Sequence, residues 1–330
     1  MSIAIFLLIT FILNFIIYLN IDWVSKVINI YDHPDVARKM HKKPMPLLGG
    51  VLIYFNLVFF LLYDFFYFKD LSLIYTDYQY FLGILVPTSL FFVLGLLDDK
   101  KDLNSYLKFV LMILILILGL KLEPDLKLSL IKFSFLESQI NLGNFSIPFT
   151  ILSFLLFINA FNMLDGINGQ AAIYTIIVFL IIFLINNSAL LILLVFSLIL
   201  FLFQNFKNKT FLGDNGTLVL GYLIGFLCIK SYNLNYFEYS DEIFLIMCIP
   251  GYELLRLFII RISKKKDPFS GDRSHLHHYL IKNYSLINTT LMMQSLFFTP
   301  YLLFVVFNNF YISLIASLSV YILFILILKK

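Results

Sequence analysis

Long apolar runs separated by short polar segments make up most of this chain of 330 residues. A helix needs about 20 mainly apolar residues to cross a bilayer, and runs of roughly this length recur from one end of the sequence to the other. The pattern predicts an all-α polytopic membrane protein, a bundle of about 10–11 transmembrane helices in one domain over residues 1–330. The candidate spans are 2–20, 47–68, 79–97, 106–121, 147–163, 171–185, 188–205, 216–230, 241–260, 285–307 and 309–328.

Positive charge alternates between the segments that connect these spans. Segments rich in Lys and Arg stay in the cytoplasm. This rule predicts an N-terminus outside and cytoplasmic loops at about 21–46, 98–106, 164–170, 206–215 and 261–284. The opposite side holds Lys69, Lys121, Lys127, Lys132 and Lys230. All five histidines fall on the predicted cytoplasmic side, as do the acidic motifs described below, so we expect an active-site cleft at that face.

Composition supports the membrane assignment. Hydrophobic residues make up 61% of the chain and charged residues 13%, whereas a soluble domain carries about 25% charged residues. The run from Ser2 to Asn20 lacks the basic start and the small-residue cleavage site of a signal peptide, so we expect a retained anchor. Cys228 and Cys248 lie in apolar runs and indicate neither a disulfide framework nor a metal site.

Three carboxylates gather where the third span ends. In "LLDDKKDLN", a continuing helix would place Asp98, Asp99 and Asp102 in one sector, because residues three or four apart are neighbours on a helix. Carboxylates this close repel unless a cation lies among them, and Mg²⁺ prefers one or two carboxylates together with substrate phosphates. The simpler interpretation is a solvated helix end at which Lys100 and Lys101 pair with the acids.

Two further polar segments interrupt the apolar pattern. In "NAFNMLDGINGQ", a polar side chain recurs every three residues at Asn159, Asn162, Asp165 and Asn168. This spacing drifts around a helix of 3.6 residues per turn, so the first three can line one pocket while Asn168 lies elsewhere. In "FLGDNGT", the glycines around Asp214 permit a tight turn near a ligand, and the simpler interpretation is a cap of the next helix.

The segment "DPFSGDRSHLHHYL" places His275, His277 and His278 close to Arg273. These side chains can hold a diphosphate or a nucleotide ring by hydrogen bonds and stacking. Zinc is a second interpretation, although no further Cys or Glu lies at a convincing spacing, and a solvated loop is a third.

Basic and acidic residues near two other spans have simple interpretations. In "ARKMHKKPMPLLGG", Lys42 and Lys43 can meet a phosphate at the headgroup level, although ordinary anchoring by positive charge explains most of these lysines. Glu253 and Arg256, three residues apart in the ninth span, can form an intramembrane ion pair.

Together these segments resemble the polyprenyl-phosphate N-acetylhexosamine-1-phosphate transferases, glycosyltransferase family 4. Four motifs match in order along nearly the whole chain. The aspartates of "DDKKD" resemble the aspartate-rich motif, "NAFNMLDG" resembles "NxxNxxDGxDGL", "GDNGT" resembles "GDxGS", and "HLHH" resembles "HxHH". "KPMPLLGG" also resembles the family's "PxxGG" entry to the second helix. Asn168 stands where a second Asp is usual, Thr217 replaces Ser, and Glu253 stands near a usual Asp.

The resemblance implies a reaction. A HexNAc-1-phosphate passes from a UDP-N-acetylhexosamine to undecaprenyl phosphate, UMP leaves, and the lipid-diphosphate sugar begins a cell-surface polysaccharide such as O antigen. The expected cofactor is Mg²⁺, with Mn²⁺ as a substitute. The expected partners are the two substrates, membrane lipids and a second copy of the chain in a homodimer, with no nucleic acid. The expected location is the bacterial cytoplasmic membrane.

The resemblance also implies roles for the residues of the motifs. The metal ligands are expected to be Asp214 and Asp165, with a contribution from Asp98. Asp99 is the candidate for positioning or deprotonating the acceptor phosphate. The donor is expected to meet Asn159, Asn162, Arg273, His275, His277 and His278, and the carrier phosphate to meet Lys42 or Lys43.

Rival functions leave different marks in a sequence. A secondary transporter also has many spans and intramembrane acids, but it tends to show inverted repeats and polar residues near the bilayer midplane. No internal repeat is detected here, and the acids lie at predicted cytoplasmic span ends. The DGxxAR…GxxxDxxxD spacing of CDP-alcohol phosphotransferases is absent from the sequence. A non-catalytic scaffold has only Asn168 in its favour.

Overall fold

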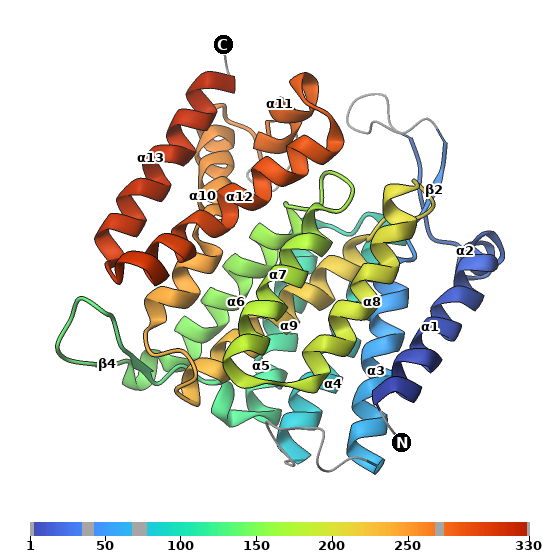
Figure 1. Cartoon of the computed structure of the whole chain (residues 1–330), viewed down its shortest axis with the longest axis horizontal. Coiled ribbons are helices and arrows are strands. Elements are labelled where there is room, and N and C mark those ends of the chain that lie inside the picture. The colour runs from blue at the N-terminus through green and yellow to red at the C-terminus, as the bar shows by residue number, and fades with distance from the viewer. Residues whose placement is uncertain (1–2, 35–42, 68–77, 268–273, 329–330) are drawn as a thin grey trace.

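The computed structural model describes residues 3–34, 43–67, 78–267 and 274–328. Over these residues helices dominate, and β-structure is confined to two antiparallel pairs of two-residue strands. Figure 1 shows the long helices packed side by side, with α1 and α13 at opposite edges of the bundle.

The described elements have the following bounds. The α-helices are α1 (Ile3–Leu19), α2 (Ile21–Ile28), α3 (Gly49–Tyr67), α4 (Tyr78–Lys101), α5 (Ser105–Leu122), α6 (Ser146–Asn162), α7 (Gln170–Asn186), α8 (Ala189–Phe206), α9 (Asp214–Asn233), α10 (Ser240–Ser263), α11 (Leu276–Asn283), α12 (Leu286–Phe307) and α13 (Phe310–Leu328). The 3₁₀ helices are η1 (Pro124–Leu126) and η2 (Gly143–Phe145). The antiparallel strand pairs are β1 (Tyr31–Asp32) with β2 (Met45–Pro46), and β3 (Leu130–Ile131) with β4 (Ile140–Asn141).

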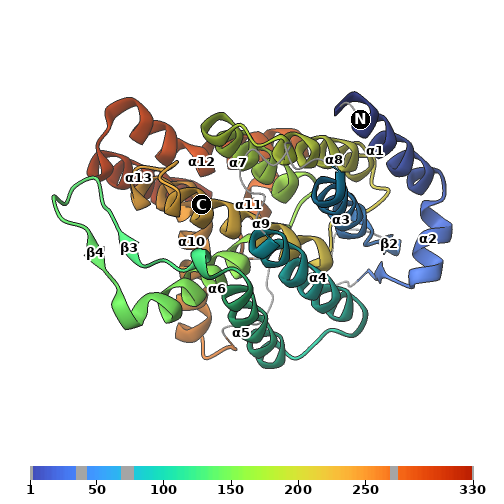
Figure 2. The ribbon, with the colours of Figure 1, turned by 90° about the horizontal axis from the view of Figure 1, so that it is seen from below.

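Helix α9 is the central helix of the bundle. Every residue from Asn215 to Tyr232 is buried, and α9 packs against α3, α4, α6 and α7. An apolar helix buried on all sides belongs in the middle of a larger structure, and Figure 2, which looks along the bundle, shows α9 near its centre. The Tyr222 hydroxyl donates to the Gly83 carbonyl of α4 at 2.6 Å, so even its polar atom is satisfied.

The described helices include several that are long and apolar enough to cross a membrane. By length and composition there are five such segments, and α1 with α2, bent by 77°, would make a sixth. The five are Tyr78–Lys101, Ser105–Leu122, Gly143–Asn162, Ser240–Ser263 and Leu286–Phe307. The shorter apolar helices are Gly49–Phe65, Gln170–Asn186, Leu190–Phe206 and Phe310–Leu326. The chain is therefore an all-α polytopic membrane protein.

Each of the predicted spans coincides with one long helix of the structure, so the predicted order of helices is confirmed. The number of membrane crossings and the single domain over 1–330 stay predictions. Two short helices, α2 and α11, were not predicted, because eight residues in a polar segment carry little periodic signal.

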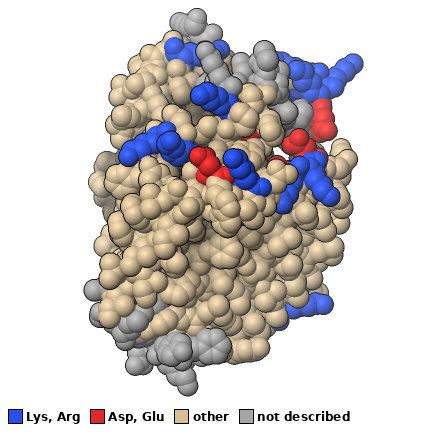
Figure 3. Space-filling view, turned by 90° about the vertical axis from the view of Figure 1, so that its right-hand side faces the viewer, with Lys and Arg blue, Asp and Glu red and all other residues tan. Residues whose placement is uncertain are grey.

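Charged side chains gather toward one end of the bundle. Figure 3 shows most of the Lys, Arg, Asp and Glu side chains of one face above a broad surface of other residues. This end holds α11 and β2, whereas α1 begins at the other end (Figure 1). The arrangement agrees with the predicted separation of basic loops from the N-terminus.

The opposite end of the bundle holds a buried ion pair. Lys230 Nζ of α9 lies 2.8 Å from Glu123 Oε1, and the two side chains are 6% and 2% exposed. Lys230 also lies 3.5 Å from Asp125 Oδ2. A buried pair of this kind joins the end of α9 to the loop that follows α5, and neither partner can be removed without leaving a buried charge.

We expect Lys230→Met to lower the free energy of unfolding by about 3–5 kcal/mol, because Glu123 would stay buried without its partner. The measurement is reversible unfolding in mixed detergent micelles. Lys132→Met is the matched control, because its pair with Glu238 is 38% and 65% exposed and is worth at most about 1 kcal/mol. Equal losses for the two variants would contradict a special role for the buried pair.

Candidate active site

The turn that begins α9 depends on the carboxylate of Asp99. Gly213 has a φ of 74°, a conformation that favours glycine, and the chain turns there into α9. Asp99, near the end of α4, accepts the backbone N–H groups of Asp214 and Asn215 at 2.9 and 3.0 Å. It also accepts the side-chain amide of Asn215 at 2.5 Å. Because the first N–H groups of a helix have no partner within it, Asp99 caps α9 from another helix.

The ammonium of Lys108, on α5, lies between two carboxylates. Its Nζ is 2.5 Å from Asp98 Oδ2 and 2.6 Å from Asp214 Oδ2. Asp98 Oδ1 accepts the backbone N–H of Leu103 at 2.8 Å. Asp214 Oδ1 accepts the side-chain amide of Asn162 at 2.7 Å. These charge-assisted bonds join α4, α5, α6 and α9 in one polar cluster.

Asp102 does not belong to this cluster. Helix α4 ends at Lys101, and Asp102 has a φ of 46°, so the chain leaves the helix there. The prediction that Asp102 shares a helical sector with Asp98 and Asp99 is therefore wrong. Its physical reason is the turn into α5, which Asp98 stabilises by binding the N–H of Leu103.

Asp165 lies in the turn that follows α6. Withdrawal from water raises the pKa of its carboxyl to about 8, and the negative charges of Asp214 and Asp99 add to the rise. A carboxyl with this pKa is mostly protonated at neutral pH unless a cation comes close. The negative charges of Asp214 and Asp99 therefore favour the protonated form of Asp165.

The histidines lie at the start of α11 and face the same turn. The His277 ring is 5.2 Å from the His275 ring and 4.4 Å from the His278 ring, measured between centroids. Burial holds the pKa of His277 well below its usual range, and the charges of His275 and His278 lower it further, so His277 is neutral at pH 7. A Cβ at Gly166 would lie 1.9 Å from His277 Nε2, so glycine lets the turn after α6 touch the histidine segment.

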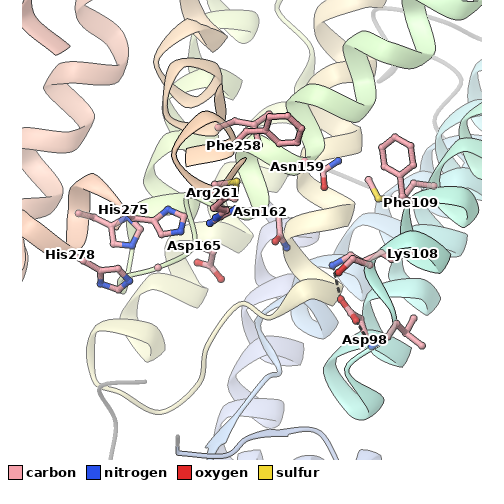
Figure 4. A pocket seen from close by; sticks show the side chains of 17 residues that line it. Asp98, Lys108, Phe109, Asn159, Asn162, Asp165, Phe258, Arg261, His275 and His278 are labelled. Atoms are coloured by element: carbon pink, nitrogen blue, oxygen red, sulfur yellow. Dashed lines mark hydrogen bonds and ion pairs between the residues drawn. The ribbon is translucent and has the colours of Figure 1, made fainter. Parts of the chain in front are cut away.

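A cavity of about 380 Å³ connects these groups. Figure 4 shows side chains from α4, α5, α6, α10 and the α11 segment lining it. Of the residues predicted from the sequence, the cavity brings together Asp98, Asn159, Asn162, Asp165, His275, His277 and His278. Asp214 contacts two lining residues, Lys108 and Asn162. Asp99 does not line the cavity, but it accepts the backbone N–H of Asp214.

The predicted carrier-phosphate residues are not part of this lining. Lys43 is exposed, and it is not among the residues around the cavity. Lys42 and Arg273 lie outside the described residues. Their expected roles stay predictions.

Comparison with known proteins places the chain in a family. A model of glycosyl transferase family 4 matches residues 81–232. The chain is 31% identical over 288 residues to the "Probable undecaprenyl-phosphate N-acetylglucosaminyl 1-phosphate transferase" of Bacillus subtilis (strain 168). The match covers 83% of this chain and 77% of that protein. This chain belongs to the polyprenyl-phosphate HexNAc-1-phosphate transferase family.

Two further relatives carry the name undecaprenyl-phosphate alpha-N-acetylglucosaminyl 1-phosphate transferase. The relative from Thermotoga maritima is 27% identical over 289 residues, covering 86% of this chain and 84% of that protein. The relative from Escherichia coli (strain K12) is 26% identical over 277 residues, covering 78% of this chain and 71% of that protein. The resemblance drawn from the four motifs is thereby confirmed.

Asn168, which departs from the family motif, lies away from the cavity. Its amide donates to the Asn205 carbonyl at 2.9 Å and to Asn208 Oδ1 at 2.7 Å. The neighbouring Gly169 N–H donates to Asn205 Oδ1 at 2.7 Å. Asn168 therefore fastens the turn after α6 to the end of α8, a task that needs an amide donor.

Two cations of the cavity were not predicted as site residues from the sequence. Lys108 and the buried Arg261 line the cavity, but in the sequence they resemble ordinary basic residues of cytoplasmic segments. One signal was present, because Lys108 falls within the predicted span 106–121, where a charged side chain is costly and usually functional.

We expect Asn168→Asp, which restores the usual family residue, to destabilise this protein by about 1–3 kcal/mol. The carboxylate cannot donate to Asn205 and Asn208, and it would face two acceptor oxygens. Thermal unfolding in detergent measures the effect. Asn144→Asp, the same change at an exposed position, is the control, and a wild-type unfolding midpoint for Asn168→Asp would refute the fastening role.

Proposed function

We propose that this chain transfers a HexNAc-1-phosphate from a UDP-sugar to undecaprenyl phosphate and releases UMP. The observation that carries the proposal is a cavity in which carboxylates, amides and histidines from three family motifs meet, with Asp214 of the fourth motif bound to its lining residues Lys108 and Asn162. The names of the relatives support the same reaction. We place the site at the cytoplasmic face of the bacterial cytoplasmic membrane, in accord with the basic loops at that end.

The proposed chemistry is the attack of a phosphate oxygen of the carrier on the sugar-bearing phosphorus. The bond to that oxygen forms while the bond to the UMP oxygen breaks, so UMP leaves with its electron pair. A carrier phosphate with a second pKa near 6 needs little help to lose its proton at neutral pH. Holding the reacting atoms in line is therefore the larger task for the protein.

Several polar residues that line or adjoin the cavity have a fitting task in this proposal. Lys108 and Arg261 offset negative charge on the phosphates. Asn159 and Asn162 line the side on which a sugar or a ribose can form hydrogen bonds. The neutral His277 can donate one hydrogen bond and accept another. Asp99 acts through α9, because both of its oxygens are engaged by the turn that presents Asp214.

Magnesium fits the donor set by its chemistry. Within the described part of the chain, no group of three or more His, Cys, Asp or Glu side chains lies at metal-binding distances. Mg²⁺ usually takes only one or two carboxylates, with water and substrate phosphates as further ligands. We propose Asp165 and Asp214 as those ligands, with Asp98 near them. The bound ion would offset the charge that accumulates on the reacting phosphates.

The finer assignments belong to the same proposal. The product would be a lipid-diphosphate sugar that begins a cell-surface polysaccharide such as O antigen, and a panel of UDP-HexNAc donors identifies the sugar. A homodimer stays a prediction. A secondary transporter is not favoured, because the polar groups of the cavity gather at one end of the bundle and the relatives are named as transferases.

The test of the function is release of UMP from UDP-GlcNAc by the purified chain in detergent with Mg²⁺, dependent on added undecaprenyl phosphate. We expect Asp99→Asn and Asp214→Asn each to lower the rate by about 100-fold or more, by analogy with the loss of one preorganised electrostatic group. Asp125→Asn, at an 80% exposed position at the far end, is the control. Wild-type rates for both variants would show the site assignment to be wrong, and no release by wild type would refute the function.

We expect the affinity for Mg²⁺ to depend on pH through Asp165. The ion binds the ionised form of Asp165, whose pKa is about 8 without it. The apparent affinity for Mg²⁺ should therefore fall by up to about tenfold per pH unit below pH 8 and level off above it. Stabilisation against heat, titrated with Mg²⁺ from pH 6 to 9, measures this. Asp165→Asn should bind more weakly with a flatter profile, and a steep wild-type slope that survives in Asp165→Asn would contradict the assignment.

A further inference from the structure

A buried polar network lies behind the histidine segment, outside the cavity. Its members are Glu253 and Arg256 of α10 and Tyr321 of α13. Glu253 is 5% exposed and Tyr321 is 4% exposed. The residues of α10 that line the cavity are Leu254, Phe258 and Arg261, so Glu253 and Arg256 are not part of the site described above.

The three side chains bind one another with matched geometry. Arg256 donates from Nη2 to Glu253 Oε1 at 2.7 Å and from Nε to Glu253 Oε2 at 3.0 Å, a two-point contact. The Tyr321 hydroxyl donates to Glu253 Oε2 at 2.5 Å and accepts from Arg256 Nε at 3.1 Å. Helix α13 is thereby joined to α10 through a carboxylate.

The same network binds the backbone on both sides of His275. Glu253 Oε1 accepts the N–H of Leu276 at 2.8 Å, and Arg256 Nη2 donates to the carbonyl of Ser274 at 2.6 Å. Leu276 is the first residue of α11, where a backbone N–H has no partner within the helix. A carboxylate at that place also suits the positive end of the helix dipole.

This geometry fixes the direction in which the histidines enter the cavity. With the groups before and after His275 held, its backbone has little freedom, and α11 starts in a set direction. His277 then meets Gly166 in the turn after α6, which is the second fixed point of the segment. The rings of His275, His277 and His278 line the cavity between these two points.

We propose that Glu253, Arg256 and Tyr321 act as positioning residues that hold the histidine segment in the form that binds the nucleotide-sugar donor. The proposal rests on the proposed function for the identity of the donor. A buried ion pair contributes little net stability compared with apolar residues of the same size, so its value here is the fixed geometry of two backbone groups. Tyr321 carries this influence from α13, a helix that contributes no lining residue to the cavity.

The simpler interpretation is that the ion pair only stabilises the packing of α10 against α13. That alternative predicts a lower unfolding midpoint for variants of the network and unchanged Michaelis constants for both substrates. The positioning role predicts a selective effect on the donor, because the carrier phosphate need not touch the histidines. The two interpretations therefore predict different ratios of the donor KM to the carrier KM. A loss of stability alone does not change this ratio.

The decisive variant is Tyr321→Phe, which keeps the ring and removes one hydroxyl. Tyr311→Phe, on the same helix and 53% exposed, is the matched control. We expect Tyr321→Phe to raise KM for UDP-GlcNAc by about tenfold, because a hydrogen bond to a charged group is lost. We expect KM for undecaprenyl phosphate to change by less than about twofold. Arg256→Lys should act in the same direction, since lysine cannot make the two-point contact.

Hydrogen–deuterium exchange of the holoenzyme provides a readout that does not depend on turnover. Peptides covering 275–281 should exchange faster in Tyr321→Phe than in wild type, and Tyr311→Phe should match wild type. Faster exchange together with a selective rise in donor KM supports the proposal. Unchanged exchange, or equal changes in the two Michaelis constants, overturns it. Failure of wild type to release UMP refutes the proposed function and with it the donor part of this inference, while exchange still decides whether the network holds the segment.

Discussion

The carboxylate of Asp99 accepts hydrogen bonds from the first turn of α9, and this contact ties the candidate active site to the centre of the fold. Helix α9 is buried along nearly its whole length, so its unpaired N–H groups cannot turn to bulk water. A partner from another helix has to satisfy them, and α4 provides one. The same contact sets the direction of the Asp214 side chain, which then meets Lys108 and Asn162. Removing one carboxylate would therefore disturb a helix start and a charge cluster together.

The rest of the site is likewise held together by polar groups that bind one another. Four carboxyl groups approach one another, and the ammonium of Lys108 lies between two of them. On the other side of the cavity, Gly166 lets a buried imidazole approach the turn after α6. Buried polar groups are costly unless they are satisfied, so these bonds hold helices distant in sequence in a defined arrangement. The cavity is the space that this arrangement leaves open.

Much of the architecture could be predicted because the bilayer imposes a simple length rule on apolar runs. All the long helices were expected at nearly their observed places, and the order of four motifs indicated the family. The pairings within the site could not be predicted in the same way. The bond of Asn168 to Asn208 joins residues 40 positions apart, and it depends on how α8 ends. The position of Asp102 could not be predicted for a similar reason. A turn into α5 moves it away from Asp98 and Asp99, beside which a continuing helix would have placed it.

The position of α9 in the chain has a consequence for biosynthesis. The ribosome makes α1 to α8 before this helix, so α3, α4, α6 and α7, against which α9 packs, emerge first. During that interval Asp99 lacks the backbone N–H groups of the α9 turn, and Asn162 lacks the Asp214 carboxylate that its amide binds. The polar cluster therefore forms only when α9 joins the bundle, and the cavity is completed later still, when α10 and the histidine segment add their lining residues. A nascent chain arrested before Gly213 would therefore hold Asp99 and Asn162 without the groups that bind them in the folded protein.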